Sequence, residues 1–202
     1  DPEYLSPLTE ITVRGTLVVE GSRGEPATFL ASTPASGEKE PTWAGIIVDG
    51  GKVVLHSCII RNAETGVEVM RGSVAMNDST LTENRYGLVI HGQKSAVRVV
   101  GENIRVQEND YGVVLLNRTM LEGTGNEVSG NRKKDTYAGA VNEYQSQRKE
   151  YKPKLQDTTR IYNDEAMLGI TVWQKKIEVR GILRVPEGSR LIIMPGTIIE
   201  FR

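Results

Sequence analysis

Apolar residues recur at every second position along the middle of the chain, in short runs separated by polar corners. Three such runs follow one another in each period, and the period closes on a glycine that opens the next apolar run. These glycines are Gly45, Gly66, Gly87 and Gly112, at steps of 21, 21 and 25 residues. Alternation of this kind places every second side chain on one face of a strand. A period of about 20 residues with β-type alternation is typical of a solenoid.

The register of the runs predicts which side chains lie on top of one another. Three short strands form one coil, and successive coils stack about 4.8 Å apart with their strands paired in parallel. One interior stack is expected to contain Ile46, Val67, Leu88 and Val113, and another Ile60, Leu81, Val106 and Val128. The sequence therefore predicts an all-β protein, a parallel β-helix of about six three-strand coils.

One corner of each coil is polar. Counting three residues on from the last interior apolar residue of each coil gives Ala63, Asn84, Asn109 and Asn131. Asparagine tolerates the left-handed backbone region, and stacked Asn amides hydrogen-bond to one another. We therefore predict a structural ladder of Asn84, Asn109 and Asn131. The glycine that follows each corner is expected to allow a turn that a side chain would obstruct.

These corners and apolar triplets, over residues 45–131, resemble those of the bacterial right-handed parallel β-helix proteins of the pectate-lyase-like superfamily. The stretch from Trp173 to Phe201, with its Pro-Gly-Thr turn, resembles the opening coils of many envelope β-helix modules. The resemblance covers residues 11–140 and 170–202 and implies a right-handed parallel β-helix. It says little about function, because this fold carries lyases, hydrolases, adhesins and inert stalks alike.

The pattern divides the chain into three parts. Residues 1–140 carry β-helix coils, residues 141–170 form a polar loop or linker, and residues 171–202 carry further coils. The segment from Ile11 resembles the segment from Ile177, at an offset of 166 residues. One interpretation is that the C-terminal part begins a second module of a longer tandem protein, and the other is that every coil uses such a pattern. Because an open last coil exposes an unpaired edge, we predict that residues 191–201 pair with the N-terminal region or with a neighbouring copy.

Composition narrows the function classes. The chain has 25 basic and 26 acidic residues and a formal charge of −1. No basic stripe indicates nucleic-acid binding, and no apolar run reaches the length of about 18 residues that membrane insertion requires. Cys58, the only cysteine, falls at an interior position and is expected to be a small buried thiol.

Few residues are candidates for chemistry. A polysaccharide lyase on this fold needs carboxylates that hold calcium, and the nearest set is Glu64, Glu83, Glu108 and Asp110, which is interleaved with arginines and is better interpreted as a mixed-charge surface. A glycosidase needs two carboxylates across a groove, and the nearest pair is Glu83 and Glu108. His56 and His91 are expected to be exposed or at corners. No metal site and no cofactor are predicted. The weak candidates for ligand contact form an aromatic and basic platform, whose alternative role is to cover apolar edges: Tyr137, Tyr144, Arg148, Tyr151 and Trp173.

The sequence thus favours a non-catalytic structural or ligand-binding β-helix module of a bacterial envelope or secreted protein. Such a module is expected outside the cell, on its surface or in the periplasm. Its expected partner is a polysaccharide or another protein, and self-association through an open solenoid end is a further expectation. The alternative is a polysaccharide-degrading enzyme, a lyase before a glycoside hydrolase. An architectural spacer without a ligand is the third interpretation.

Overall fold

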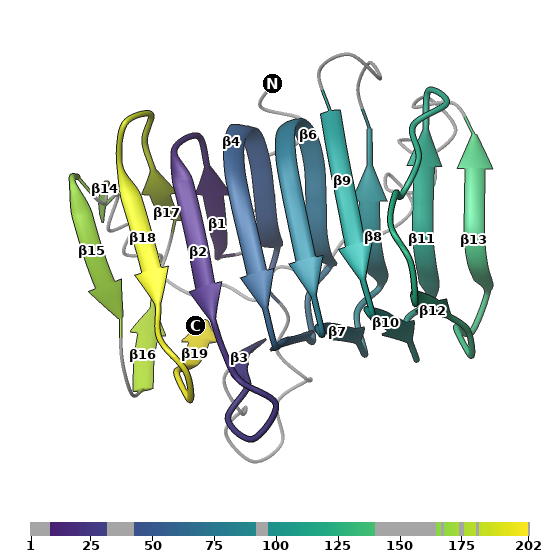
Figure 1. The fold of residues 1–202 in the computed structure, drawn as a ribbon, viewed down its shortest axis with the longest axis horizontal. Helices are drawn as coiled ribbons and strands as arrows, with labels where there is room; N and C mark the ends of the chain where they lie inside the picture. The colour runs from purple at the N-terminus through teal and green to yellow at the C-terminus, as the bar shows by residue number, and fades with distance from the viewer. Residues whose placement is uncertain are drawn as a thin grey trace, which may run out of the picture.

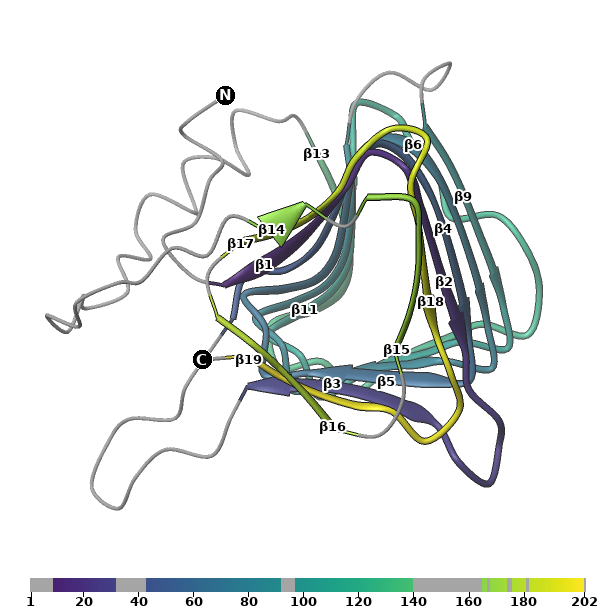
Figure 2. The ribbon, with the colours of Figure 1, turned by 90° about the vertical axis from the view of Figure 1, so that its left-hand side faces the viewer.

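The computed structural model describes residues 9–31, 43–91, 97–139, 165–166, 168–173, 176–180 and 182–201. Its 19 strands form one sheet of 12 strands and one of seven, and the strands within each sheet pair in parallel. Successive coils stack along one axis and have a triangular cross-section (Figure 2). The predicted all-β parallel β-helix is confirmed.

Each coil contributes strands to three faces, which we call faces 1, 2 and 3. Face 1 contains β14 (Glu165–Ala166), β17 (Ile182–Val185), β1 (Glu10–Val13), β8 (Tyr86–Ile90), β11 (Tyr111–Leu116) and β13 (Lys134–Gly139). Face 2 contains β15 (Ile170–Trp173), β18 (Arg190–Ile193), β2 (Thr16–Glu20) and β9 (Val97–Glu102). Face 3 is the seven-stranded sheet of β16 (Lys176–Val179), β19 (Ile198–Phe201), β3 (Ala27–Ala31), β5 (Cys58–Arg61), β7 (Thr80–Thr82), β10 (Arg105–Gln107) and β12 (Glu127–Val128).

Two long strands, β4 (Gly45–His56) and β6 (Thr65–Asn77), run from face 1 onto face 2 and join them into one sheet. The register between these strands shifts near Asp49, where the chain turns the corner. Gly72 has a φ of 101° there, and a Cβ on it would lie 2.2 Å from the carbonyl oxygen of Gly51. The corner therefore requires glycine on β6.

The predicted interior register is confirmed. Ile46, Val67, Leu88 and Val113 are consecutive partners across β4, β6, β8 and β11. Ile60, Leu81, Val106 and Val128 are consecutive partners across β5, β7, β10 and β12. Nearly all of these side chains are buried in one aliphatic core that follows the axis. Removal of this apolar surface from water is the main stabilising contribution.

The C-terminal coils stack on the N-terminal coil, so the order of the coils in space differs from their order in the chain. Strand β17 pairs with β1, β18 with β2 and β19 with β3. The yellow strand β18 lies beside the purple strand β2 (Figure 1). The Phe201 ring stacks on Trp43, with 4.0 Å between the ring centroids. The predicted pairing of residues 191–201 with the chain's own N-terminal region is confirmed.

The resemblance at an offset of 166 residues is not a structural equivalence. Ile11 on face 1 pairs with Leu183, whereas Ile177 lies on β16 of face 3. The same short pattern thus serves two different faces of the coil. The second-module interpretation stays a prediction. Inside the predicted linker, the structure places β14 and the first residue of β15. The described residues include no helical segment of the length and hydrophobicity that a membrane span requires.

Candidate functional site

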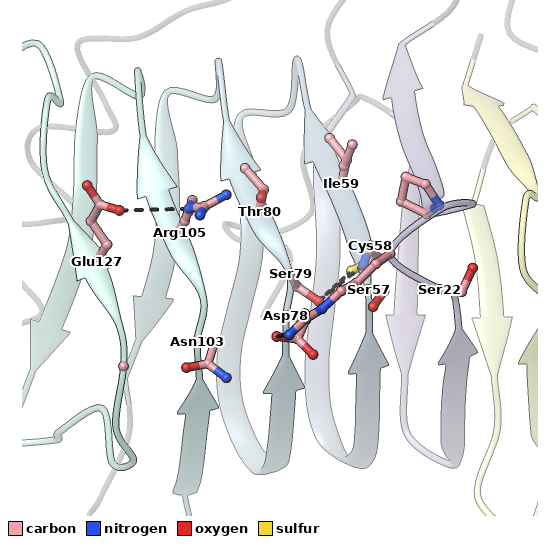
Figure 3. Close-up of a pocket in the computed structure, with 13 residues that line it drawn as sticks. Ser22, Ser57, Cys58, Ile59, Asp78, Ser79, Thr80, Asn103, Arg105 and Glu127 are labelled. Atoms are coloured by element: carbon pink, nitrogen blue, oxygen red, sulfur yellow. Dashed lines mark hydrogen bonds and ion pairs between the residues drawn. The ribbon is translucent and has the colours of Figure 1, made fainter.

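A groove of about 640 Å³ follows the corner where face 2 turns into face 3 (Figure 3). One wall is a column of Ser57, Asp78, Asn103 and Gly125, which come from four successive coils. All four have positive φ, from 47° to 69°. A single left-handed residue turns the chain sharply, so each coil changes face at this column, where Asp78 and Asn103 contribute short polar side chains to the groove lining.

The other wall is the outer surface of face 3. Ile59, Thr80, Arg105 and Glu127 are consecutive partners on β5, β7, β10 and β12. The turn that begins at Ser22 and Arg23 lines one end of the groove. Because the coils repeat about every 4.8 Å, the groove presents polar groups at regular intervals along its length.

Two ion pairs lie within the groove. Arg23 contacts Asp78 at 3.5 Å, and Arg105 contacts Glu127 at 3.7 Å. Both arginine side chains are largely exposed. Exposed pairs of this kind contribute little to stability and exchange readily with other partners, so these four charged groups are accessible to a ligand.

The floor of the groove combines satisfied and unsatisfied polar atoms. The Ser79 hydroxyl accepts hydrogen bonds from the Cys58 backbone N–H and thiol and donates to the carbonyl of Asn77. The Ser57 hydroxyl is buried and makes no hydrogen bond within the described part of the chain. Its oxygen is enclosed by protein atoms, so a ligand in the groove would contact other polar groups of the lining.

The thiol of Cys58 is expected to be inert in the folded protein. Burial raises its pKa to about 12, and only the thiolate is an effective nucleophile. We expect a chromogenic disulfide reagent at pH 8 to titrate no thiol in native buffer and one thiol per chain in denaturant. Rapid labelling without denaturant would show that this corner opens in the native state.

The predicted aromatic and basic platform is not assembled in the described residues. Tyr137 lies on β13 and Trp173 on β15, at opposite ends of the solenoid (Figure 1). Trp173 is 8 % exposed and belongs to the interior core, whereas Tyr137 packs against a separate outer cluster on face 1 that includes Tyr86 and Val114. Tyr144, Arg148 and Tyr151 lie outside the described residues.

The three predicted asparagines are hydrogen-bonded in series at the corner between faces 3 and 1. The Asn84 amide donates to Asn109 at 3.0 Å, and the Asn109 amide donates to Asn131 at 2.9 Å. Asn131 donates to the Asp135 carboxylate, which ends the series. Hydrogen bonds from the backbone and side chain of Asn131 lower the pKa of Asp135.

The left-handed residues at this corner are the neighbours of the ladder residues, contrary to the expectation from sequence. Asn62, Glu83 and Glu108 have φ between 54° and 58°, and each directly precedes a ladder position. The residue that turns the chain points its side chain outward, and the next residue points its amide inward. The two tasks therefore fall on different positions.

The carboxylates considered for catalysis do not line the groove. Glu83 and Glu108 lie in the left-handed column at the ladder corner. Glu64 lies in a different column, in register with Arg85 and Asp110. Arg61 pairs with Glu83 at 3.8 Å, and Arg132 pairs with Asp110 at 3.1 Å. Charges of opposite sign thus meet between adjacent coils, as expected of a mixed-charge surface.

Asp49, at the corner between faces 1 and 2, also contacts charges of opposite sign on adjacent coils. It accepts hydrogen bonds from Arg14 at 2.9 Å and from Arg71 at 3.0 Å. Burial pushes the pKa of Asp49 upward, but the two guanidinium groups outweigh that effect and hold the pKa below its usual value.

The two histidines differ. His56 is exposed at the end of β4, as predicted. His91 directly follows the last residue of β8, at the end of face 1, and it is not exposed: its side chain is buried and contacts the Glu68 carboxylate at 3.1 Å. Glu68 pairs with Val89 in the next coil, so His91, two residues further on, points to the same outer side. No group of three or more His, Cys, Asp or Glu side chains arranged to hold a metal ion occurs among the described residues.

Comparison with known proteins adds no family to this description: no protein-family model, no curated protein and no solved structure matches the chain.

Proposed function

We propose that this chain is a non-catalytic, ligand-binding β-helix module and that a linear polysaccharide binds along the groove between faces 2 and 3. The observation that carries the proposal is a groove of about 640 Å³ whose lining repeats polar side chains from coil to coil. The proposed location is outside the cell, on its surface or in the periplasm, and the support for it is the resemblance of the coils to envelope β-helix proteins.

The lining favours a hydroxyl-rich ligand. Hydroxyl, amide, carboxylate and guanidinium groups follow one another along the groove, and large apolar side chains are few. Sugar hydroxyls both donate and accept, so they match a row that mixes donors and acceptors. A groove several coils long suits an extended chain better than a compact small molecule.

A glycan array followed by calorimetry tests the proposal. In a glycan that binds, we expect the double variant Thr80→Ala, Arg105→Ala to lower the affinity at least about tenfold, because two hydrogen-bonding groups leave the wall. Thr82→Ala is the matched control, since Thr82 lies on the same strand and bonds to Glu108 outside the groove. Equal losses for the two variants, or unchanged affinity in the double variant, would place the glycan elsewhere.

One observation favours the alternative, a polysaccharide-degrading enzyme. Asp78 and Glu127 line the same groove two coils apart, a separation of about 10 Å along the axis. Inverting glycoside hydrolases place two carboxyl groups about 6.5–9.5 Å apart around a water, slightly closer than this axial spacing. New reducing ends from a bound glycan, lost in Asp78→Asn and in Glu127→Gln while binding is kept, would establish the enzyme. A bound glycan that stays intact would establish the binding module.

A further inference from the structure

An apolar stripe runs along the outside of face 2. Val172, Ile192, Val18, Val54, Ala75 and Val100 are consecutive partners across six strands, from β15 to β9. Each lies between residues that point inward; for example, Val18 lies between Leu17 and Val19, which are both in the core. All six therefore point outward, with Val172 exposed, Val18 buried among its neighbours and the other four half-buried. An unbroken aliphatic column over six coils is unusual for a solvated sheet face, which normally alternates apolar inside with polar outside.

The stripe is flanked by charges of opposite sign. Two residues before each stripe position, a second column of outward side chains runs along the face. In this column Arg190 on β18 and Lys52 on β4 are the neighbours of Thr16 on β2. The residues two positions after it include Glu20 on β2. All three charged side chains are exposed. Face 2 thus has a basic edge, an apolar centre and an acidic edge.

These flanking charges differ in their pairing from other charged residues that the structure describes. Elsewhere opposite charges pair between coils, as in Arg14 with Asp49 and Arg98 with Glu122. Within the described part of the chain, Glu20, Lys52 and Arg190 form no ion pair. Three uncompensated charges beside an apolar stripe indicate that their complement is supplied by another molecule.

We propose that face 2 binds face 2 of a second copy of this chain, related by a two-fold axis parallel to the solenoid axis. Such an axis lays the stripe of one copy on the stripe of the other and exchanges the two edges. Glu20 of each copy then faces the basic edge of the other copy. Along the solenoid axis, it lies between Arg190 and Lys52 of that copy. A two-fold axis perpendicular to the solenoid would instead oppose like charges, so the charges select the parallel arrangement.

The size of the face sets the strength of association. Five steps of about 4.8 Å give a length of about 24 Å, and three columns about 7 Å apart give a width of about 20 Å with side chains. Two such faces bury about 1,000 Å² in total, at the lower end of specific interfaces. A dissociation constant in the micromolar range is therefore expected. The groove lies around the corner from this face, and the inference is independent of the proposed function.

Charge-reversal variants test the arrangement. The monomer–dimer equilibrium of each is measured by sedimentation velocity over a concentration series that reaches high micromolar. We expect the wild-type chain to dimerise. Glu20→Lys alone and the double variant Lys52→Glu, Arg190→Glu alone should each associate at least about tenfold more weakly, because like charges then face each other. An equimolar mixture of the two should dimerise again, since every facing pair is then attractive. Glu25→Lys, the same charge change in the exposed turn outside face 2, should dimerise like the wild type.

Three outcomes would contradict the proposed dimer. A wild-type chain that stays monomeric, a Glu20→Lys chain that dimerises like the wild type, or a mixture that stays monomeric overturns the proposal. All of the exchanged side chains are exposed, and circular dichroism of each variant establishes that it is folded before it is counted.

Discussion

Gly45→Ala is expected to abolish stable folding. Gly45 opens β4 with a φ of 121°, and a Cβ on it would lie 1.6 Å from the carbonyl oxygen of Thr65 in the next coil. Both the backbone conformation and the contact exclude a side chain, and the obstructing atom is backbone that pairs coil to coil. Conflicts of this kind cost more than about 4 kcal/mol, against a typical total stability of about 5–15 kcal/mol. Soluble yield and urea unfolding measure the effect.

Gly24→Ala is the matched control. A Cβ on Gly24 meets nothing within 4 Å, and its φ is not in the left-handed range. Alanine there restricts the unfolded chain and is expected to leave stability unchanged or raise it by up to about 1 kcal/mol. If Gly45→Ala unfolds at the same urea concentration as Gly24→Ala, β4 does not begin in the conformation described.

Asn109→Ala is expected to lower the free energy of unfolding by about 3 kcal/mol. The Asn109 amide N–H groups donate to the carbonyls of Leu81 and Gln107 as well as to Asn131. Its oxygen accepts from the backbone and the amide of Asn84. The side chain is fully buried, so alanine leaves several buried polar groups without partners, each at a cost of about 1–3 kcal/mol before relaxation.

Urea unfolding of Asn109→Ala is compared with that of Asn77→Ala. Asn77 ends β6 and its side chain makes no hydrogen bond within the described residues, so its removal is expected to cost less than about 0.5 kcal/mol. The double variant of Asn84 and Asn109 should lose less than the sum of the single losses, because the two amides share a bond. Equal midpoints for Asn109→Ala and Asn77→Ala would mean that the ladder corner is solvated.

The interior of the solenoid could be predicted from sequence because two periodicities fix it together. Alternation assigns Ile46 or Val67 to the inside, and the period of 21 residues stacks one on the other. Corners are harder. Counting located the ladder position but gave the turn to the wrong neighbour, since Glu108 and Asn109 are both polar and only the backbone shows which one has positive φ.

The groove was missed because its wall has no common chemistry. Ser57, Asp78 and Asn103 differ in type and read as ordinary turn residues one at a time. A signal was nonetheless present. Each follows the last residue of a face-2 strand. The coil-to-coil pairing predicted for the interior residues also fixes the pairing of these corner residues, and would have aligned them in one column. The same step would have brought Glu68 and His91 to one side of adjacent coils. A preference for loops as binding sites instead drew attention to residues that the fold separates.

The permuted order of the coils has a consequence for synthesis. Among the described strands, a ribosome delivers β1, β2 and β3 before the others, and the coils that follow stack on one edge of them in the order in which they emerge. The other edge of β1–β3 receives its partners, β17–β19, only when residues 182–201 leave the tunnel. Until then the nascent solenoid grows in one direction from a coil whose other edge is open to chaperones or to a neighbouring nascent chain.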